Sequence, residues 1–143
     1  MTIVKNYYRL VNQLRKNGCR CDRKRIKPVS PLKINELLNQ AALNHANDMA
    51  SKIFFAHLGS NGSDSSDRIS KTGYDWQVVG ENIFWGEVKM EEVFEGWKDS
   101  ASYFKNMMSN DFKEMGFAHV GYYWVQYLGC LLYTSDAADD LLC

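Results

Sequence analysis

The sequence predicts an α+β fold in which helices cover a β-sheet. Three segments within the first hundred residues repeat their apolar side chains at helical spacing. A later segment, residues 114–128, changes to two short runs broken at Gly121, which is typical of neighbouring antiparallel strands. Helices first and strands late favour a sheet covered by helices. A chain of 143 residues buries one sizeable core and is too short for two full domains.

A first amphipathic helix is expected before Gly18, which provides a stop, because apolar side chains recur at helical spacing at Ile3, Tyr7, Leu10, Val11 and Leu14. A basic loop follows. Asn35 then supplies an N-cap for a second helix, and Gly59 lies just beyond its expected end. The apolar face of this second helix comprises Leu37, Leu38, Ala41, Ala42, His45, Met49 and Ile53.

The histidine on that apolar face, His45, is expected to be buried and hydrogen-bonded in a structural role, and we leave it out of the site. Further along, Asp64 can cap a short helix that ends before Gly73. The third strong helical pattern runs from residue 90 to residue 99. Its apolar side consists of Val93, Phe94 and Trp97.

The charge distribution is uneven although the formal net charge is zero. Residues 1–27 carry nine bases and one acid, and the rest of the chain carries eight bases and sixteen acids. The basic run has no aromatic platform or recognised module beside it, so we expect a solvated loop and no nucleic-acid partner. No apolar stretch is long enough for a transmembrane segment, and the start of the chain lacks the apolar core of a signal peptide.

The last fourteen residues differ from the rest of the sequence. The segment 130–139 resembles the translation of a transposon-type sequencing-library adapter. We therefore expect one domain over residues 1–129, followed by a non-native or disordered tail over residues 130–143. A short amphipathic tail is the alternative.

An ordered series of short motifs extends from about Tyr8 to Gly129. Each motif is weak by itself, but the set in this order is specific. The series resembles the CAP superfamily, which comprises the cysteine-rich secretory, antigen 5 and pathogenesis-related proteins, and it is most similar to the short bacterial SCP-type branch. The motifs are AALNHANDMA (residues 41–50), FFAH (54–57), DRI (67–69), GY (73–74), GENI (80–83), Trp97, NMM (106–108) and YWVQ (123–126).

The resemblance implies a three-layer α-β-α sandwich with a mainly antiparallel central sheet, in an exported, extracellular protein. It also implies a central cleft that carries histidine and acidic side chains. His57 matches the first cleft histidine of the family, and Glu81 matches the first cleft glutamate. Tyr103 stands where the second histidine belongs, and the residues after Trp97 give no secure match to the second glutamate of many eukaryotic relatives.

These departures weaken the prediction of a metal site. A catalytic zinc centre takes about three protein ligands. His57 and Glu81 are weak candidates, and the Tyr103 phenol, with an ordinary pKa of about 10, would have to lose its proton to join them. We expect no required cofactor and at most weak binding of a divalent metal such as zinc. The sequence also shows no nucleophile for His57 or Glu81 to activate.

The cysteine pattern departs from the family as well. Cys19 and Cys21 resemble a feature of some secreted bacterial members, whose partner cysteine often follows the second cleft histidine, where this chain has Phe104. One or both thiols are therefore expected to lack a partner. A bridge between Cys19 and Cys21 themselves would close a very small, strained ring.

The function implied by the resemblance is binding rather than catalysis. The ligand classes it suggests are a small apolar molecule, such as a sterol or other lipid, and a surface protein. A metal-assisted hydrolase or protease using His57 and Glu81 is one alternative, and a structural domain with a relict cleft is another. In the simplest interpretation, His57 lies at a helix C-terminus and Glu81 binds backbone amides in a tight turn. The oligomeric state is left open.

Overall fold

The computed structural model describes residues 3–21 and 24–132. Most of the predicted tail, residues 133–143, lies outside this range. The chain order of the elements is α1 (Ile3–Asn17), β1 (Cys19–Cys21), β2 (Lys24–Ile26), β3 (Lys33–Ile34), α2 (Glu36–Lys52), α3 (Ser65–Lys71), β4 (Trp76–Trp85), α4 (Met90–Asp99), α5 (Ala101–Met108), β5 (Glu114–Val120) and β6 (Tyr123–Leu131).

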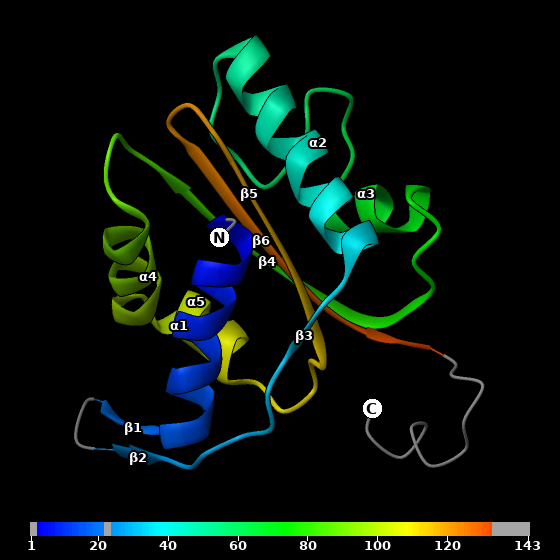
Figure 1. The fold of residues 1–143 in the computed structure, drawn as a ribbon. Helices are drawn as coiled ribbons and strands as arrows, with labels where there is room; N and C mark the ends of the chain where they lie inside the picture. Colours follow the sequence, from blue (N-terminus) through cyan, green and yellow to red (C-terminus); the bar gives the residue numbers. More distant parts are fainter. Residues whose placement is uncertain (1–2, 22–23, 133–143) are drawn as a thin grey trace.

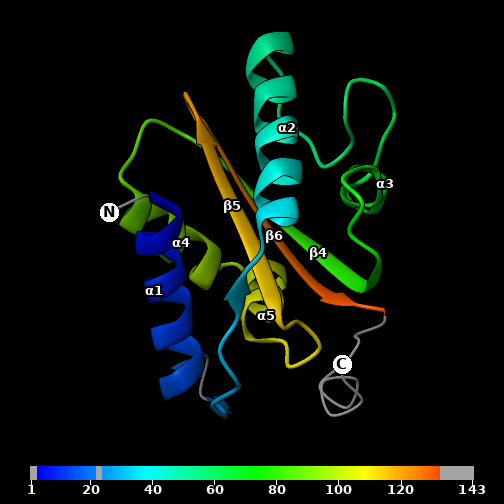
Figure 2. The same ribbon diagram turned by 45° about the vertical axis from the view of Figure 1, so that its right-hand side comes forward.

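The elements form the three layers that the sequence predicts. Figures 1 and 2 show the sheet of β3, β4, β5 and β6 between two groups of helices. α2 and α3 cover one face, and α1, α4 and α5 cover the other. Each helical group contributes to its own cluster of buried side chains against the sheet. The core therefore lies on both sides of the strands, as packing on two apolar faces requires.

The sheet has the strand order β3-β5-β6-β4 and is mixed. β5 pairs with β6 and β6 with β4 in antiparallel fashion, and the two-residue strand β3 pairs with β5 in parallel. The prediction of a mainly antiparallel sheet was wrong in leaving out this parallel edge. A strand of two residues is too short to show any periodicity, so only the return of the chain beside β5 creates it.

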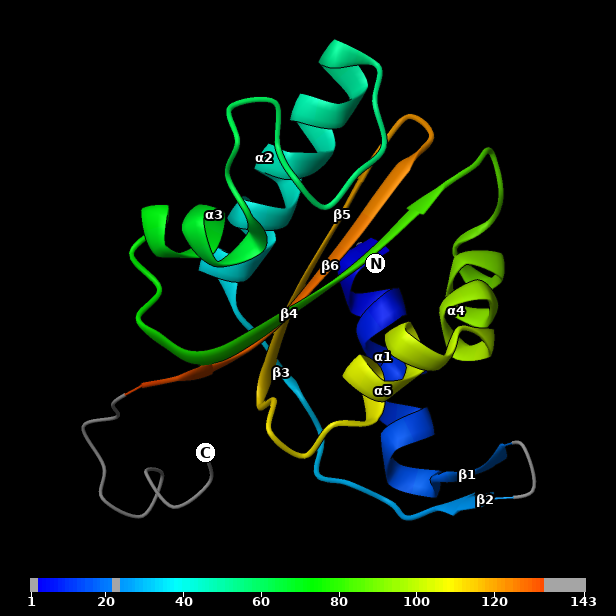
Figure 3. The ribbon, with the colours of Figure 1, turned by 180° about the vertical axis from the view of Figure 1, so that it is seen from behind.

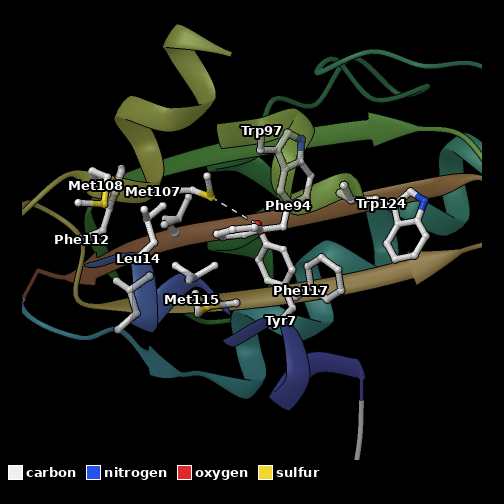
Figure 4. Close-up of a cluster of buried hydrophobic side chains, with 14 residues drawn as sticks. Tyr7, Leu14, Phe94, Trp97, Met107, Met108, Phe112, Met115, Phe117 and Trp124 are labelled. Carbon is white, nitrogen blue, oxygen red and sulfur yellow. Dashed lines mark hydrogen bonds between the residues drawn. The ribbon is translucent and has the colours of Figure 1, made fainter. Parts of the chain in front are cut away.

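Helix α1 contributes Tyr7 to a cluster of aromatic and sulfur-containing side chains between α1, α4, α5 and the sheet (Figure 4). The Tyr7 ring stacks on Phe117 of β5, with ring centroids 4.2 Å apart and an interplanar angle of 4°. Trp97 of α4 meets Tyr7 edge to face at 5.5 Å. These contacts bury the three aromatic side chains almost completely and attach α1 to the sheet.

The same helix carries a fully buried arginine, Arg15. Its guanidinium donates to the carbonyls of Ser30 at 2.7 Å, Met107 at 2.8 Å and Ser109 at 3.0 Å. Burial lowers the pKa of Arg15 to about 10. Because Met107 and Ser109 lie at the C-terminal end of α5, this cation satisfies carbonyls that the helix itself leaves without donors.

Helix α2 begins as predicted. The Asn35 side chain accepts from the backbone N–H groups of Leu37 at 2.9 Å and Leu38 at 3.2 Å. The helix ends earlier than predicted, because Ile53 adopts a left-handed conformation with φ 55° after Lys52, well before Gly59. The predicted apolar face was also too wide, since Leu37 and Ile53 are exposed.

The capping prediction for α3 and the bounds predicted for α4 are confirmed. Asp64 and Asp67 form a reciprocal capping box at the start of α3, and α4 buries Val93, Phe94 and Trp97. Sequence reasoning missed α5 and β4. The first has only eight residues, and the second carries buried Glu81 and Asn82 in its centre, so neither has a simple apolar period.

Candidate functional site

The predicted site residues meet at the outer edge of β4, between the two helical layers. Figure 3 shows β4 in front of the sheet, with α2 and α3 on one side and α4 and α5 on the other. Glu81 lies within β4, His57 in the connection between α2 and α3, and Tyr103 on α5. Three elements that are distant in sequence therefore bring one side chain each to this edge.

The histidine and the glutamate make the shortest contact of the group. His57 Nδ1 lies 2.5 Å from Glu81 Oε1, and the Tyr103 hydroxyl lies 3.4 Å from His57 Nε2. The Glu81 side chain is 3% exposed, whereas that of His57 is 58% exposed. The imidazole thus connects a buried carboxylate to the surface, with the phenol beside its outer nitrogen.

The simplest interpretations of this pair were wrong. α2 ends at Lys52, so His57 is not at a helix C-terminus, and Glu81 lies in a strand rather than in a tight turn. Both interpretations depended on local sequence, whereas the strand and the early end of α2 depend on packing against the sheet.

A fourth residue, Arg68 of α3, completes the site, and sequence reasoning gave it no role. Its Nη2 donates to Glu81 Oε2 at 2.8 Å and to the His57 carbonyl at 2.6 Å. Its Nε donates to the hydroxyl of Tyr127, which lies opposite Glu81 on β6, at 2.8 Å. The sequence feature that could have indicated a role for Arg68 is its position in the DRI motif, directly after Asp67 of the α3 capping box.

These contacts set the ionisation of the site. Burial alone would raise the pKa of Glu81, but hydrogen bonds from His57 and Tyr127 and the charge of Arg68 outweigh it and lower that pKa. The hydrogen bond to Glu81 raises the pKa of His57. Burial and the nearby Glu81 charge raise the pKa of Tyr103, which therefore stays protonated at neutral pH. The site combines one buried carboxylate with an arginine and a readily protonated imidazole.

The buried position predicted for His45 is confirmed. Its side chain has no exposed area, and Nε2 lies 2.8 Å from the carbonyl of Ala56. Burial lowers the pKa of His45, which favours the neutral ring with the proton on Nε2. The same nitrogen is 4.0 Å from Glu81 Oε2, so His45 lies directly behind the site.

Asparagine side chains hold β4 and α5 together beneath the site. Asn106 Nδ2 donates to Asn82 Oδ1 at 2.9 Å and to the Glu81 carbonyl at 3.3 Å. Asn82 Nδ2 in turn donates to Gln126 Oε1 at 2.9 Å on β6. This network fixes the strand that carries Glu81 relative to the helix that carries Tyr103.

The donor set does not fit a zinc centre. Glu81 uses one oxygen on His57 and the other on Arg68, whose charge opposes a second cation. His57 Nδ1 is occupied, and the nearest neighbour of Nε2 is a phenol with a raised pKa. Among the residues that the structure describes, no group of three or more His, Cys, Asp or Glu side chains could hold a metal ion.

An apolar groove adjoins the polar residues and shares Tyr103 with them. Its volume is about 660 Å³. Several of its side chains are unusually exposed for apolar residues, including Phe55 at 47% and Trp85 at 55%. The lining residues are Ile53, Phe54, Phe55, Ile83, Phe84, Trp85, Tyr103 and Tyr123.

The layered fold and the site between its layers define a domain of a known class. The family model of the cysteine-rich secretory protein family, CAP, matches residues 8–134. The chain therefore belongs to the CAP family, as the motif series indicated.

Several proteins similar to this chain are bacterial. The chain is 31% identical over 100 residues to the uncharacterized protein YkwD of Bacillus subtilis (strain 168), a match that covers 68% of this chain and 39% of that protein. An extracellular protein containing an SCP domain from Bacillus anthracis str. Ames has a similar structure, with a TM-score of 0.77, 20% identity and coverage of 88% of this chain and 39% of that one. An outer surface protein of Borrelia burgdorferi gives a TM-score of 0.74 at 20% identity, over 87% of this chain and 90% of that one.

Two of these comparisons concern longer proteins. The chain spans about two fifths of the length of YkwD and of the Bacillus anthracis protein. At 20% identity the solved structures establish the shared fold. Within the described part of the chain, no helix combines the length and the apolar character needed to cross a membrane.

Cys19 is disulfide-bonded, and so is Cys130 in β6. This excludes the case in which both Cys19 and Cys21 lack a partner, and the case in which Cys21 alone lacks one stays a prediction. The Cys21 side chain lies outside the described part of the structure.

Proposed function

We propose that this chain is an extracellular binding domain of the CAP family, acting through the β4-edge site of His57, Glu81, Arg68 and Tyr103. The proposal rests on the position of Tyr103. Its side chain lines the apolar groove and also lies beside the exposed imidazole of His57, so the groove and the polar residues adjoin each other there. A ligand with an apolar body and a polar end complements such a site, because concave apolar walls supply affinity and a few polar groups fix orientation. The extracellular SCP-domain structure from Bacillus anthracis supports the location.

Binding is favoured over turnover by the state of the polar groups. Both oxygens of Glu81 are engaged, and the site offers no serine, threonine or cysteine side chain to His57 in any described contact. With Nδ1 directed at Glu81, the exposed Nε2 of His57 is the remaining candidate base, and turnover would still need a nucleophile, which no described side-chain contact of this ring supplies. The ligand classes that suit the groove are a sterol or other lipid and an apolar segment of a surface protein.

Lipid binding is tested with cholesterol, palmitate and phosphatidylcholine added separately to the full chain. A ligand that binds only the folded state raises the melting temperature by mass action. Because Trp85 is exposed in the groove, its fluorescence should change in the same titration. Phe55→Ser should weaken both responses, whereas Leu43→Ser, which removes a comparably exposed side chain from α2 outside the groove, should leave them unchanged.

The alternative of a metal-assisted hydrolase makes a different prediction. Zinc would have to raise the melting temperature of the chain, and His57→Ala would have to abolish that effect. Tyr103→His is the positive control, because it places a second imidazole beside His57 Nε2. We expect the melting temperature to respond to zinc in Tyr103→His and not in the unmodified chain.

A relict cleft gives a third result. In that case the affinity for any lipid or protein ligand would be the same in Phe55→Ser and His57→Ala as in the unmodified chain, and both variants would fold normally. Such a result would overturn the proposed binding function.

A further inference from the structure

His45 is a fully buried side chain with one hydrogen-bonded nitrogen and one orphaned nitrogen. Its Nε2 lies 2.8 Å from the carbonyl of Ala56. A carbonyl oxygen only accepts, so Nε2 carries the proton and Nδ1 carries a lone pair. No described residue donates to Nδ1, which is buried as well. Burial lowers the pKa of His45, in agreement with a neutral ring.

The orphaned nitrogen argues against a role in packing alone. A buried acceptor without a donor is costly, whereas an apolar ring of similar shape would fill the space without that cost. The surroundings suit an apolar ring, because the same face of α2 buries Ala42 and Met49. The ring of Phe54 also meets His45 edge to face, with centroids 6.4 Å apart. What the imidazole adds at this position is the Nε2 donor.

The carbonyl that accepts from this donor belongs to the segment that carries both halves of the site. Residues 54–58 lie outside every helix and strand. Phe55 lines the apolar groove, and His57 supplies the imidazole of the polar site. Ala56 lies between them in sequence. The bond from His45 therefore restrains the chain at the residue that separates the two functional side chains.

Two further bonds from side chains restrain the chain after Ala56. Arg68 Nη2 donates to the His57 carbonyl at 2.6 Å. Asp48, three residues after His45 on α2, accepts from the N–H of Ser60 at 2.9 Å and from its hydroxyl at 2.6 Å. Ser60 is exposed, so water competes for that bond, whereas the His45 ring is shielded from water. His45 thus provides the buried anchor of the segment.

We propose that His45 is a positioning residue of the β4-edge site. By holding the Ala56 carbonyl, it places the His57 imidazole beside Glu81. The same bond keeps Phe55 in the wall of the groove. The inference rests on the proposed binding function and adds a residue that no ligand touches. A site whose groups are held in place before the ligand arrives loses less conformational entropy on binding.

Two variants of His45 test the role of the donor. His45→Phe keeps a ring of similar shape and removes the donor. His45→Gln retains one, because the Gln amide nitrogen is as many bonds from Cα as the imidazole Nε2. Neither change alters the charge of the neutral ring. Both variants are compared with the unmodified full chain.

The measurement is the titration of the His57 ring signals by NMR. The hydrogen bond to Glu81 is the largest cause of the raised His57 pKa. A released Ala56 should weaken that bond, so the His57 pKa should fall toward 6.5 in His45→Phe and return to the unmodified value in His45→Gln. An unchanged His57 pKa in a folded His45→Phe variant would overturn the inference.

Leu38→Ala separates positioning from a general loss of stability. Leu38 is fully buried in the first turn of α2, about two turns before His45. Its truncation should lower the urea midpoint of unfolding and leave the His57 pKa unchanged. Equal falls of the His57 pKa in Leu38→Ala and His45→Phe would assign the effect to general loosening and contradict the inference.

The tautomer of His45 gives a test that needs no variant. Nitrogen-15 chemical shifts of the ring distinguish a protonated from an unprotonated nitrogen. We expect the proton on Nε2, with a coupling across the hydrogen bond to the Ala56 carbonyl. A proton on Nδ1 would exclude that hydrogen bond and with it the positioning role, even if every variant failed to fold.

Titrations with cholesterol, palmitate and phosphatidylcholine distinguish this inference from the proposed function. A lipid that binds the unmodified chain should bind His45→Phe about fivefold more weakly, and His45→Gln should recover the loss. Equal affinity for the unmodified chain and His45→Phe means that the inference fails while the proposed function stands. If no lipid binds and the His57 pKa still falls in His45→Phe, lipid binding fails while the positioning of His57 stands.

Discussion

The Tyr103 hydroxyl lies 3.4 Å from His57 Nε2 across the edge of β4. The phenol therefore places a polar group at the position where the resemblance to the family predicts a second histidine. It cannot act as that histidine does, because its raised pKa keeps the proton on the oxygen. The site therefore contains one imidazole with a phenol hydroxyl beside it, where two histidines would provide two imidazoles.

The link between His57 and Glu81 should be measurable as a pKa. Glu81→Gln removes the charged partner whose hydrogen bond is the largest cause of the raised His57 pKa. We expect that pKa to fall, in a titration of the His57 ring signals by NMR. Glu87→Gln, a change at an exposed acid outside the site, should leave the titration where it is. An unchanged His57 pKa in Glu81→Gln would show that the contact is absent in solution.

The same pair predicts how stability depends on pH. The His57 pKa is raised above its ordinary value of 6.5, so the stability it contributes is complete below that pH and is lost as pH rises through the folded-state pKa. The Glu81 pKa is lowered below 4.5, so its contribution is present above that pH and is lost as pH falls through the folded-state value. Urea unfolding across this range should therefore show the pair contributing most between about pH 4.5 and 6.5. His57→Ala should flatten the alkaline side of the profile, and a persistent slope there would assign it to other groups.

Arg68 should be essential for stability. Arg68→Ala leaves the buried Glu81 carboxylate without its cation and the Tyr127 hydroxyl without its donor, so we expect a loss of about 3–5 kcal/mol in the free energy of unfolding. Arg68→Lys should recover little, since one ammonium group cannot reproduce the guanidinium fork. The control is Lys71→Ala, an exposed change at the end of α3, expected within about 0.5 kcal/mol of the unmodified chain. A loss below about 1 kcal/mol for Arg68→Ala would mean that water compensates the carboxylate.

Ile53 offers a stabilising substitution. It is β-branched, has φ 55° and is 84% exposed, so it has an unfavourable backbone conformation without burying its side chain. Ile53→Gly should raise the free energy of unfolding by about 1 kcal/mol in urea titrations. Ile53→Ala keeps the Cβ atom and should gain little. A stability loss in Ile53→Gly would contradict the assigned strain.

Some features of the protein were determined by the sequence alone. The helical periods of α1 and α4, the caps of α2 and α3 and the break at Gly121 are local, because each depends on side chains within a few positions of one another. The motif order also identified His57, Glu81 and Tyr103 as candidate site residues. These patterns were sufficient to predict the layers and the family.

The tertiary structure decided the rest. The parallel pairing of β3, the strand around Glu81 and the role of Arg68 depend on residues that meet only after the layers have packed. The same holds for the groove, whose lining residues come from β4, α5 and the connection after α2, and for the position of β4 at the edge of the sheet. Local sequence specifies which residues prefer a helix or a strand. The ionisation of a buried carboxylate and the exposure of a sheet edge are set by contacts between distant segments, which a local pattern does not contain.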